Sequence, residues 1–241
     1  MANPYFQFKQ FTVYHDRSSL KVSTDSCLFG AWVAARIGSS PLSVSRALDI
    51  GTGTGLLMLM LAQQFAGNID GIEIDHDSFE QATENIQASP WHNRLHLFHH
   101  DVKLFALPHQ YDLIISNPPF FEHDLKSGTL KNNLAKHDDG LTLNDLLEVV
   151  DRNLTAKGLF AVLLPYQRTG YFEELAAGYH LFVSDKLSAR QTPNHPWFRS
   201  MLLFSRSDKG IAHETELTIR DKGEVYSDAF ITLVKDYYLY L

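Results

Sequence analysis

Hydrophobic and polar positions change their spacing along this chain. Residues 1–23 alternate aromatic and polar side chains, which predicts a short hairpin or arm. The compact apolar stretch Cys27–Ile37 predicts a helix. Three residues that can cap its amino end precede it: Thr24, Asp25 and Ser26. Residues 38–45 are rich in Ser and include Gly and Pro, so they predict a loop.

Strands and helices alternate from Arg46 onward. Short apolar runs predict strands at residues 46–50, 68–74, 95–99, 111–116, 158–164, 180–189 and 198–206. Periodic or capped segments predict helices at residues 55–65, 75–88, 141–154, 172–178 and 226–241. This alternation is typical of an α/β protein with a parallel, doubly wound sheet. A ligand is expected at the carboxyl ends of the strands, near the turn after the first one.

Length and composition fit one domain. The chain has 241 residues, 44% of them hydrophobic, and a single α/β domain can reach roughly 250 residues. We expect residues 46–207 to form its core, residues 1–45 an arm and helix, and residues 208–241 a tail. The densest apolar run, Leu56–Ala62, is seven residues long, against about 20 for a membrane span. No signal peptide is apparent at the amino end.

Charge and cysteine content exclude several classes of protein. The chain has 21 basic and 28 acidic residues, a net charge of −7, which argues against a protein that coats nucleic acid non-specifically. The single cysteine, Cys27, excludes an internal disulfide and a Cys-based zinc site, and fits the cytoplasm. We expect no metal, because His96, His99 and His100 fall across one predicted strand and its end without a carboxylate pattern.

A glycine-rich turn follows the first strand of the alternating region. Asp49 precedes Gly51, Gly53 and Gly55, and an apolar helix begins directly afterwards. Glycine lets the backbone approach a ligand closely. The spacing is G-x-G-x-G, so neither the G-x-G-x-x-G of dinucleotide sites nor a P-loop is present. A pyrophosphate binds a helix amino end without a nearby anion, so Asp49 favours a cationic or amino-bearing ligand.

Two further acids end the next two predicted strands. Glu73 lies 24 residues after Asp49, and its carboxylate can accept a hydrogen bond from each hydroxyl of a ribose. Asp75 is the competitor, but its position is better suited to capping the next helix. Asp101, with Val102 directly after it, follows the third predicted strand. The alternative is that these acids have purely structural roles at a helix end and a turn.

The tetrapeptide Asn117-Pro118-Pro119-Phe120 follows the fourth strand. Its prolines restrict the backbone and remove amide donors, which leaves carbonyl oxygens to face a ligand. A planar NH2 group could donate to the Asn117 and Pro118 oxygens while its ring stacks on Phe120. The correct position of this NH2 group would then account for most of the acceleration of the reaction. A proline turn without a catalytic role is the alternative.

The glycine-rich turn and the tetrapeptide both resemble motifs of a known enzyme family. The Asp49–Gly55 pattern resembles motif I of class I S-adenosylmethionine-dependent methyltransferases, and the tetrapeptide resembles motif IV of the members that methylate amino groups. The resemblance implies a Rossmann-like fold with a mostly parallel, seven-stranded sheet and a C-terminal antiparallel hairpin. It implies S-adenosylmethionine as cofactor, held by Thr24, Asp25, Asp49, Gly51, Thr52, Gly53, Gly55, Glu73, Ile74, Asp101, Val102 and Asn117. It implies Asn117, Pro118, Pro119 and Phe120 as catalytic residues.

Four segments narrow the resemblance: Phe11–Arg17, Lys21–Trp32, Ser116–Phe121 and Arg190–Phe204. Together they are similar to the bacterial tRNA1(Val) adenine N6-methyltransferases, the YfiC-like family, over nearly the whole chain. The resemblance implies a tRNA substrate methylated at adenine 37, and it implies Thr24 and Asp25 near the methionine end of the cofactor. The chain departs from the family at Phe120, where tyrosine is common, and at Ser23 and Ser26, where glycine is usual.

The distribution of charge agrees with an RNA substrate. Residues 186–207 and 125–137 contain Lys and Arg but no acid, whereas residues 69–84 hold six acids and no Lys or Arg. The residues we expect to contact RNA are Lys126, Lys131, Lys136, Arg190 and Arg199. We also hypothesise that the loop after the tetrapeptide orders over the substrate. A nucleotide of an anticodon loop can be splayed out and stacked without opening a duplex.

Other functions remain open. The same tetrapeptide serves methylation of guanine N2 in rRNA and of the glutamine amide in proteins. A methyltransferase fold that only binds RNA is the non-enzymatic alternative, against which the intact Asp49, Glu73 and Asn117 argue. Nothing in the sequence implies a membrane or a stable protein partner.

Overall fold

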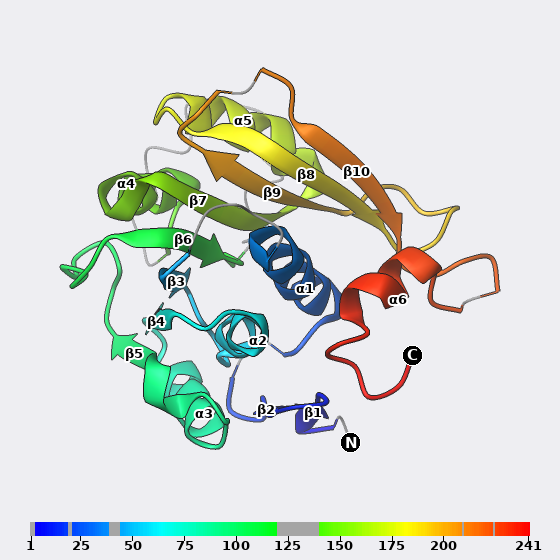
Figure 1. Cartoon of the computed structure of the whole chain (residues 1–241), viewed down its shortest axis with the longest axis horizontal. Helices are drawn as coiled ribbons and strands as arrows, with labels where there is room; N and C mark the ends of the chain where they lie inside the picture. Colours follow the sequence, from blue (N-terminus) through cyan, green and yellow to red (C-terminus); the bar gives the residue numbers. More distant parts are fainter. Residues whose placement is uncertain (1–2, 19–20, 39–43, 120–139, 209, 224) are drawn as a thin grey trace.

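The computed structural model describes residues 3–18, 21–38, 44–119, 140–208, 210–223 and 225–241 (Figure 1). Within these residues the chain folds around a sheet of eight strands. The strands are β3 (Arg46–Ile50), β4 (Asn68–Glu73), β5 (Leu95–His99), β6 (Tyr111–Ser116), β7 (Leu154–Pro165), β8 (Phe182–Arg190), β9 (Arg199–Ser205) and β10 (His213–Thr218). A separate antiparallel hairpin pairs β1 (Tyr5–Gln7) with β2 (Thr12–Tyr14), as the aromatic alternation predicts.

Helices separate most of these strands along the chain. They are α1 (Thr24–Gly38), α2 (Leu56–Gln64), α3 (His76–Gln87), α4 (Leu143–Asn153), α5 (Thr169–Ala177) and α6 (Asp228–Val234), with single 3-10 turns η1 (His92–Arg94) and η3 (Tyr166–Arg168). Across the described ranges, none of the helices combines the length and the apolar content that a bilayer span requires.

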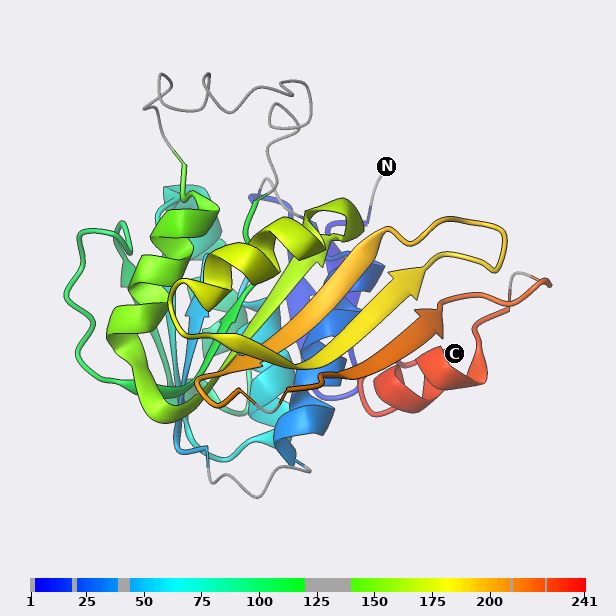
Figure 2. The same cartoon turned by 90° about the horizontal axis from the view of Figure 1, so that it is seen from above.

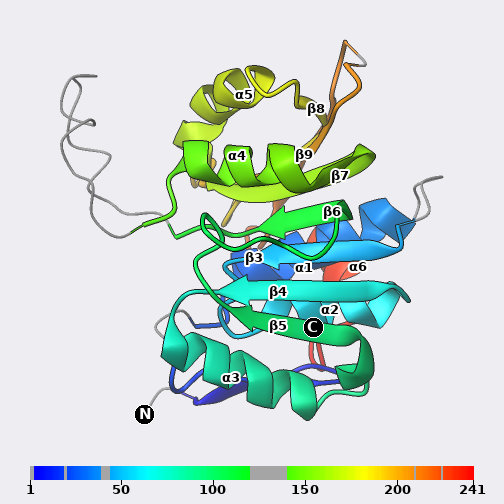
Figure 3. The ribbon, with the colours of Figure 1, turned by 90° about the vertical axis from the view of Figure 1, so that its left-hand side faces the viewer.

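The order of strands in the sheet is β10-β8-β9-β7-β6-β3-β4-β5. The strands β5, β4, β3, β6 and β7 run parallel to one another, and Figure 3 shows β6, β3, β4 and β5 stacked in this order. Strand β9 runs antiparallel to both of its neighbours, β7 and β8. The mostly parallel, doubly wound sheet and its antiparallel C-terminal part are therefore confirmed.

The number of strands differs from the prediction of seven. The eighth strand, β10, pairs in parallel with β8 at the edge of the sheet and lies in the segment expected to be only a tail. Its sequence, His-Glu-Thr-Glu-Leu-Thr, has one buried side chain, Leu217, so it carries almost no apolar signal. The helix expected over residues 226–241 is shorter, because Ser227 caps α6 and the helix ends at Val234. Figure 2 shows α6 next to β10.

Both faces of the central strands are covered. Side chains of β3 and β6 alternate between two apolar clusters, because successive residues of a strand point to opposite faces. Ala47 and Leu113 belong to the cluster that includes α1, α2 and α6, whereas Leu48 and Ile114 belong to the cluster that includes α4 and α5. This arrangement explains why the run Leu113-Ile114-Ile115 is apolar without interruption.

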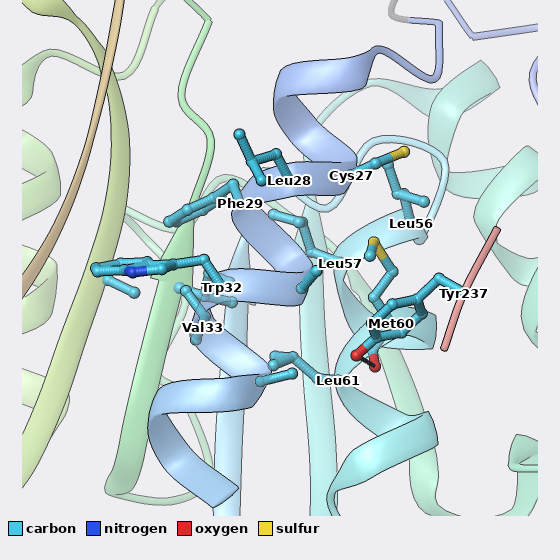
Figure 4. Close-up of a cluster of buried hydrophobic side chains, with 14 of the residues drawn as sticks. Cys27, Leu28, Phe29, Trp32, Val33, Leu56, Leu57, Met60, Leu61 and Tyr237 are labelled. Carbon is cyan, nitrogen blue, oxygen red and sulfur yellow. Dashed lines mark hydrogen bonds between the residues drawn. The ribbon is translucent and has the colours of Figure 1, made fainter. Parts of the chain in front are cut away.

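Helix α2 is buried along almost its whole length, as its lack of polar residues predicts. It packs against both α1 and the sheet, and Figure 4 shows Tyr237 from the C-terminal segment against Met60 of α2. The Tyr237 hydroxyl donates a hydrogen bond to the Met60 carbonyl oxygen at 3.1 Å. Helix α1 approaches closely at Gly30, where an added Cβ would lie 2.7 Å from Met60 Sδ.

The N-terminal arm joins the same apolar cluster. Phe8 and Phe11 are buried, and their rings stack with centroids 4.5 Å apart. Phe8 also forms an isolated antiparallel bridge with Tyr238, and the Lys9 amide donates to the Tyr237 carbonyl oxygen at 2.8 Å. The first and last parts of the described chain are thus hydrogen-bonded to each other.

Candidate active site at the carboxyl edge of the sheet

The predicted site residues meet because their strands are parallel. Asp49 of β3 lies in register with Gly71 of β4 and with Ile115 of β6. The glycine turn, Glu73 and Asn117 therefore stand at one edge of the sheet, at the ends of three adjacent strands. The edge is the one at which parallel α/β sheets bind their ligands.

The glycine turn depends on backbone conformations that favour glycine. Gly51, Gly53 and Gly55 have φ angles of 71°, 56° and 80°, values that side chains with a Cβ seldom adopt. A Cβ added at Gly51 or Gly53 would meet no atom of the described residues within 4 Å. The described residues therefore leave the space in front of this turn open, so that its backbone can approach a ligand directly.

Asp49 has one carboxylate oxygen in use and one unpaired. Its side chain is fully buried, and Thr52 Oγ1 donates to Oδ2 at 2.6 Å. Oδ1 is buried and has no hydrogen-bond partner among the described residues. Burial raises the pKa of this carboxyl to about 7, with a further increase from the charge of Glu73 and a decrease from the Thr52 hydrogen bond. An ammonium group would satisfy Oδ1, so the residues present fit the amino end of S-adenosylmethionine.

Glu73 supports the glycine turn from the neighbouring strand. Its carboxylate accepts the Gly53 amide on Oε2 at 2.8 Å, and the Ile74 and Asp75 amides on Oε1 at 2.9 Å each. A carboxylate has about four acceptor positions, so one remains on Oε2 for a ligand hydroxyl.

Asp75 caps α3, as predicted. Its side chain accepts the Ser78 amide at 2.9 Å, and this hydrogen bond lowers the pKa of the Asp75 carboxyl. Ile74, beside it, is 64% exposed and presents an apolar face to solvent at this edge.

Asp101 and Val102 follow β5 at the same edge. Asp101 Oδ1 accepts the Lys103 amide at 2.9 Å, and its Oδ2 lies 3.7 Å from Lys103 Nζ. Val102 is buried against the cluster that contains Ile72. Asp101 therefore has a structural role in its turn, whatever ligand it also contacts.

Asn117 is half-buried directly after β6. Its Nδ2 donates to Ser26 Oγ in the first turn of α1 at 3.0 Å. Pro118 is buried and Pro119 is exposed. The fourth member of the tetrapeptide, Phe120, lies outside the described residues, as do Lys126, Lys131 and Lys136.

Helix α1 begins earlier than predicted and is capped differently. Ser23 precedes the helix, and its Oγ accepts the Ser26 amide at 3.4 Å, so the expected caps Thr24, Asp25 and Ser26 form the first turn instead. Asp25 Oδ2 accepts a hydrogen bond from Arg199 Nε at 2.7 Å. Sequence spacing gave no sign of the contact between Ser26 and Asn117, which are 91 positions apart.

The basic residues near the site are held by protein contacts. Arg190 donates from Nε to Thr218 Oγ1 at 2.9 Å, and its guanidinium lies 4.6 Å from the centre of the Trp197 ring. The ring of Tyr166 lies 6.5 Å from that of Trp197. Because β8 ends and β9 begins at this edge, these arginine and aromatic groups lie on the same side of the sheet as Asn117. Within the described ranges, no three His, Cys, Asp or Glu side chains gather in a way that could hold a metal ion.

Comparisons with known proteins agree with this geometry. The Methyltransferase small domain family matches residues 36–162. A tRNA1(Val) (adenine(37)-N6)-methyltransferase of Flavobacterium johnsoniae is 39% identical over 237 residues, which cover 97% of this chain and 99% of the relative. A protein of the same description from Phocaeicola vulgatus is 40% identical over 240 residues, 99% of each chain.

Solved structures show the same fold at lower identity. A protein of Agrobacterium tumefaciens described as a predicted O-methyltransferase has a TM-score of 0.65 and 17% identity, covering 88% of this chain and 96% of its own. The ribosomal protein L11 methylase of Lactobacillus delbrueckii has a TM-score of 0.57 and 18% identity, covering 81% and 84%. The chain has the class I methyltransferase fold, and it belongs to the family of the tRNA1(Val) (adenine(37)-N6)-methyltransferases.

Proposed function

We propose that this protein transfers a methyl group from S-adenosylmethionine to the exocyclic N6 of adenine 37 in tRNA1(Val). The observation that carries the proposal is the near-full-length identity to relatives of that description. It extends over the arm, the core and the C-terminal segment, and so includes more than the motifs that many methyltransferases share. We propose that residues 1–241 act as one methyltransferase domain. A tRNA substrate would place the reaction in the cytoplasm.

The cofactor side of the proposal rests on the two carboxylates. S-adenosylmethionine, when bound, supplies a methyl group on a positively charged sulfur. Asp49 Oδ1, which is buried and lacks a partner among the described residues, would accept from its ammonium group. Glu73 Oε2 would accept from a ribose hydroxyl while the same carboxylate keeps the glycine turn in place. Asp101 and Val102 would border the adenine.

The acceptor side rests on Asn117. An adenine N6 amino group has two protons and a lone pair conjugated with its ring. Asn117 Oδ1 and the Pro118 carbonyl oxygen would each accept a hydrogen bond from one of the two N–H groups, which would hold the nitrogen in place and increase its electron density. The tetrapeptide contains no strong base, so orientation and these two hydrogen bonds would supply the rate.

RNA would approach over the arginine and aromatic groups at the same edge. Arg190 and Arg199 would contact phosphates, and Trp197 and Tyr166 offer rings on which bases can stack. The contacts that Arg190 and Arg199 make with Thr218 and Asp25 hold both guanidinium groups in defined positions before RNA arrives.

The test is methyl transfer from labelled S-adenosylmethionine to unmodified total tRNA, followed by nucleoside analysis. We expect label in N6-methyladenosine, and we expect it to disappear when adenine 37 of tRNA1(Val) is replaced by guanine. Label in N2-methylguanosine or in a protein glutamine would instead support one of the related activities. Cofactor binding without any transfer would support a protein that only binds RNA.

A further inference from the structure

A network of hydrogen bonds connects Asn117, through the first turn of α1, with Arg199 at the start of β9. Asn117 Nδ2 donates to Ser26 Oγ at 3.0 Å, and Ser26 Oγ lies 2.8 Å from Ser23 Oγ. Ser23 Oγ donates in turn to Asp25 Oδ1 at 2.5 Å. Asp25 Oδ2 accepts from Arg199 Nε at 2.7 Å. The network thus joins residues that follow β6, begin α1 and begin β9.

The number of available protons fixes which group donates and which accepts in every hydrogen bond of this network. The Asp25 carboxylate can only accept, so the one hydroxyl proton of Ser23 points to it. Ser23 Oγ must therefore accept from Ser26, which uses the only hydroxyl proton that Ser26 has. Ser26 Oγ can then only accept from Asn117, and the group that donates to it must be the NH2 of the amide. An amide rotated by 180° would leave two oxygens facing each other without a proton between them.

We propose that Ser26 is a positioning residue that orients the Asn117 amide, with its NH2 toward α1 and its Oδ1 toward the acceptor nitrogen. Ser23 and Asp25 set the direction of the Ser26 hydroxyl, and Arg199 holds Asp25. The inference rests on the proposed function, because Oδ1 needs this orientation only if it accepts from a substrate amino group. Arg199 consequently has a role at the site that does not require contact with RNA.

The main experiment replaces Ser26 with alanine. Ser26→Ala leaves Oδ1 and NH2 of Asn117 free to exchange places, so we expect kcat to fall by about threefold to tenfold, as for one lost hydrogen bond. The Kd for S-adenosylmethionine and the KM for tRNA should change by less than about twofold. Ser26→Thr keeps a hydroxyl and should restore kcat. The matched control is Ser184→Ala, which removes the hydrogen bond that Ser184 of β8 donates to the Leu203 carbonyl oxygen of β9 at 3.1 Å.

A second variant separates positioning from loss of stability. Because Ser23 acts on Asn117 only through Ser26, the double variant Ser23→Ala/Ser26→Ala should have the same kcat as Ser26→Ala alone. Effects of the two substitutions that multiply, or a kcat of Ser26→Ala equal to that of the unsubstituted protein, would overturn the inference.

A measurement independent of activity keeps the inference apart from the proposed function. The side-chain NH2 signals of Asn117 in an amide NMR spectrum can be assigned from their loss in Asn117→Ala. They should shift in Ser26→Ala and stay in place in Ser184→Ala. Unsubstituted protein that fails to methylate tRNA would refute the proposed function, whereas NH2 signals that do not respond to Ser26→Ala would refute the role of Ser26.

Discussion

Asp49 and Glu73 stand at the ends of neighbouring strands, yet their oxygens are used differently. Glu73 has three backbone amides on its carboxylate, which makes it part of the framework of the glycine turn. Asp49 has only the Thr52 hydroxyl and one buried oxygen without a partner among the described residues. A buried carboxylate oxygen without a hydrogen-bond partner lowers the stability of the fold unless a cation or a donor binds to it. The two acids therefore contribute to binding in unequal ways.

The first prediction concerns the contribution of Asp49 to the affinity of the protein for S-adenosylmethionine. Asp49→Asn should weaken S-adenosylmethionine binding on the order of 100-fold at pH 8, because it removes one member of a buried charge pair. In the unsubstituted protein the affinity should rise as the pH increases toward about 7, the pKa of the Asp49 carboxyl, and then level off. Titration calorimetry between pH 5.5 and pH 8, with about the same ionic strength throughout, measures both effects. An identical pH profile in the variant would contradict this role.

The second prediction concerns the stability of the protein without ligand. This stability should fall as the pH rises, whereas the affinity for S-adenosylmethionine should increase. The folded state keeps a proton on Asp49 at pH values where the unfolded chain has lost it. The contribution of Asp49 to stability is therefore fully present below about pH 4 and is lost as the pH rises to about 7. The Tm of Asp49→Asn should increase relative to that of the unsubstituted protein across this range. A Tm difference that does not change with pH would argue against the raised pKa.

The third prediction tests the acceptor side. Asn117→Ala removes the oxygen proposed to orient the acceptor nitrogen, so kcat should fall by at least about 100-fold. The Kd for S-adenosylmethionine should change far less. Single-turnover rates and calorimetry on the same preparation separate the two, and a variant that keeps its rate would exclude Asn117 from catalysis.

Residues that end parallel strands could be found from sequence, and residues that meet across elements could not. The positions of Asp49, Glu73 and Asn117 follow from strand ends that must share an edge. The contact of Ser26 with Asn117 depends on how α1 lies against the sheet, and no spacing encodes a packing angle. The serine cap of α1 has a local signal in Ser23, but the first apolar residue, Cys27, draws the predicted start too far along the chain.

Elements with strong periodicity were predicted to within a few residues, and the two with weak periodicity were not. Strand β10 stands at an edge, where only one side chain is buried, so its polar residues do not resemble a strand. Helix α6 has a buried apolar side, but the aromatic residues after Val234 belong to a segment that turns back toward α2 and the arm. In both, contacts with distant parts of the chain decide the structure more than local preference does.

The fourth prediction belongs to α6. Phe230 is fully buried and stacks on Tyr226 with ring centroids 4.7 Å apart. Phe230→Ala should lower the free energy of unfolding by about 3 to 5 kcal/mol. Tyr240→Ala, at a side chain that is 87% exposed, should change it by less than about 0.5 kcal/mol. Urea denaturation compares the two. Equal, small effects would show that α6 is not part of the core.

At the scale of the whole molecule, acidic and basic residues gather in different places. The acids of residues 69–84 lie on β4, on α3 and at the N-cap of α3. Arg190 and Arg199 lie at the far side of the same edge, where β8 ends and β9 begins. A negative net charge is therefore compatible with an anionic substrate, because the substrate meets only one part of the surface. The sequence already separates the two kinds of charge along the chain, and the strand order adds that they lie on opposite sides of the central strands.

The fifth prediction follows from this separation. If Arg190 contacts a phosphate, Arg190→Ala should raise the KM for tRNA and reduce the slope of log KM against log salt concentration by about one. Arg206→Ala is the matched control, because Arg206 follows β9 at the opposite edge, where it pairs with Asp151 at 2.8 Å. Its salt slope should equal that of the unsubstituted protein. Equal slopes for all three proteins would remove Arg190 from the RNA surface.

The bond between the arm and the C-terminal segment has a consequence for the order of synthesis. Phe8 and Lys9 pair with Tyr237 and Tyr238, which a ribosome adds more than two hundred residues later. Until then the apolar side of α2 that Tyr237 covers stays exposed on the nascent chain. A polypeptide released before this point lacks the last part of its core and is a target for proteolysis. Stability of the apolar cluster around α2 therefore depends on residues that are synthesised more than two hundred positions after the arm they contact.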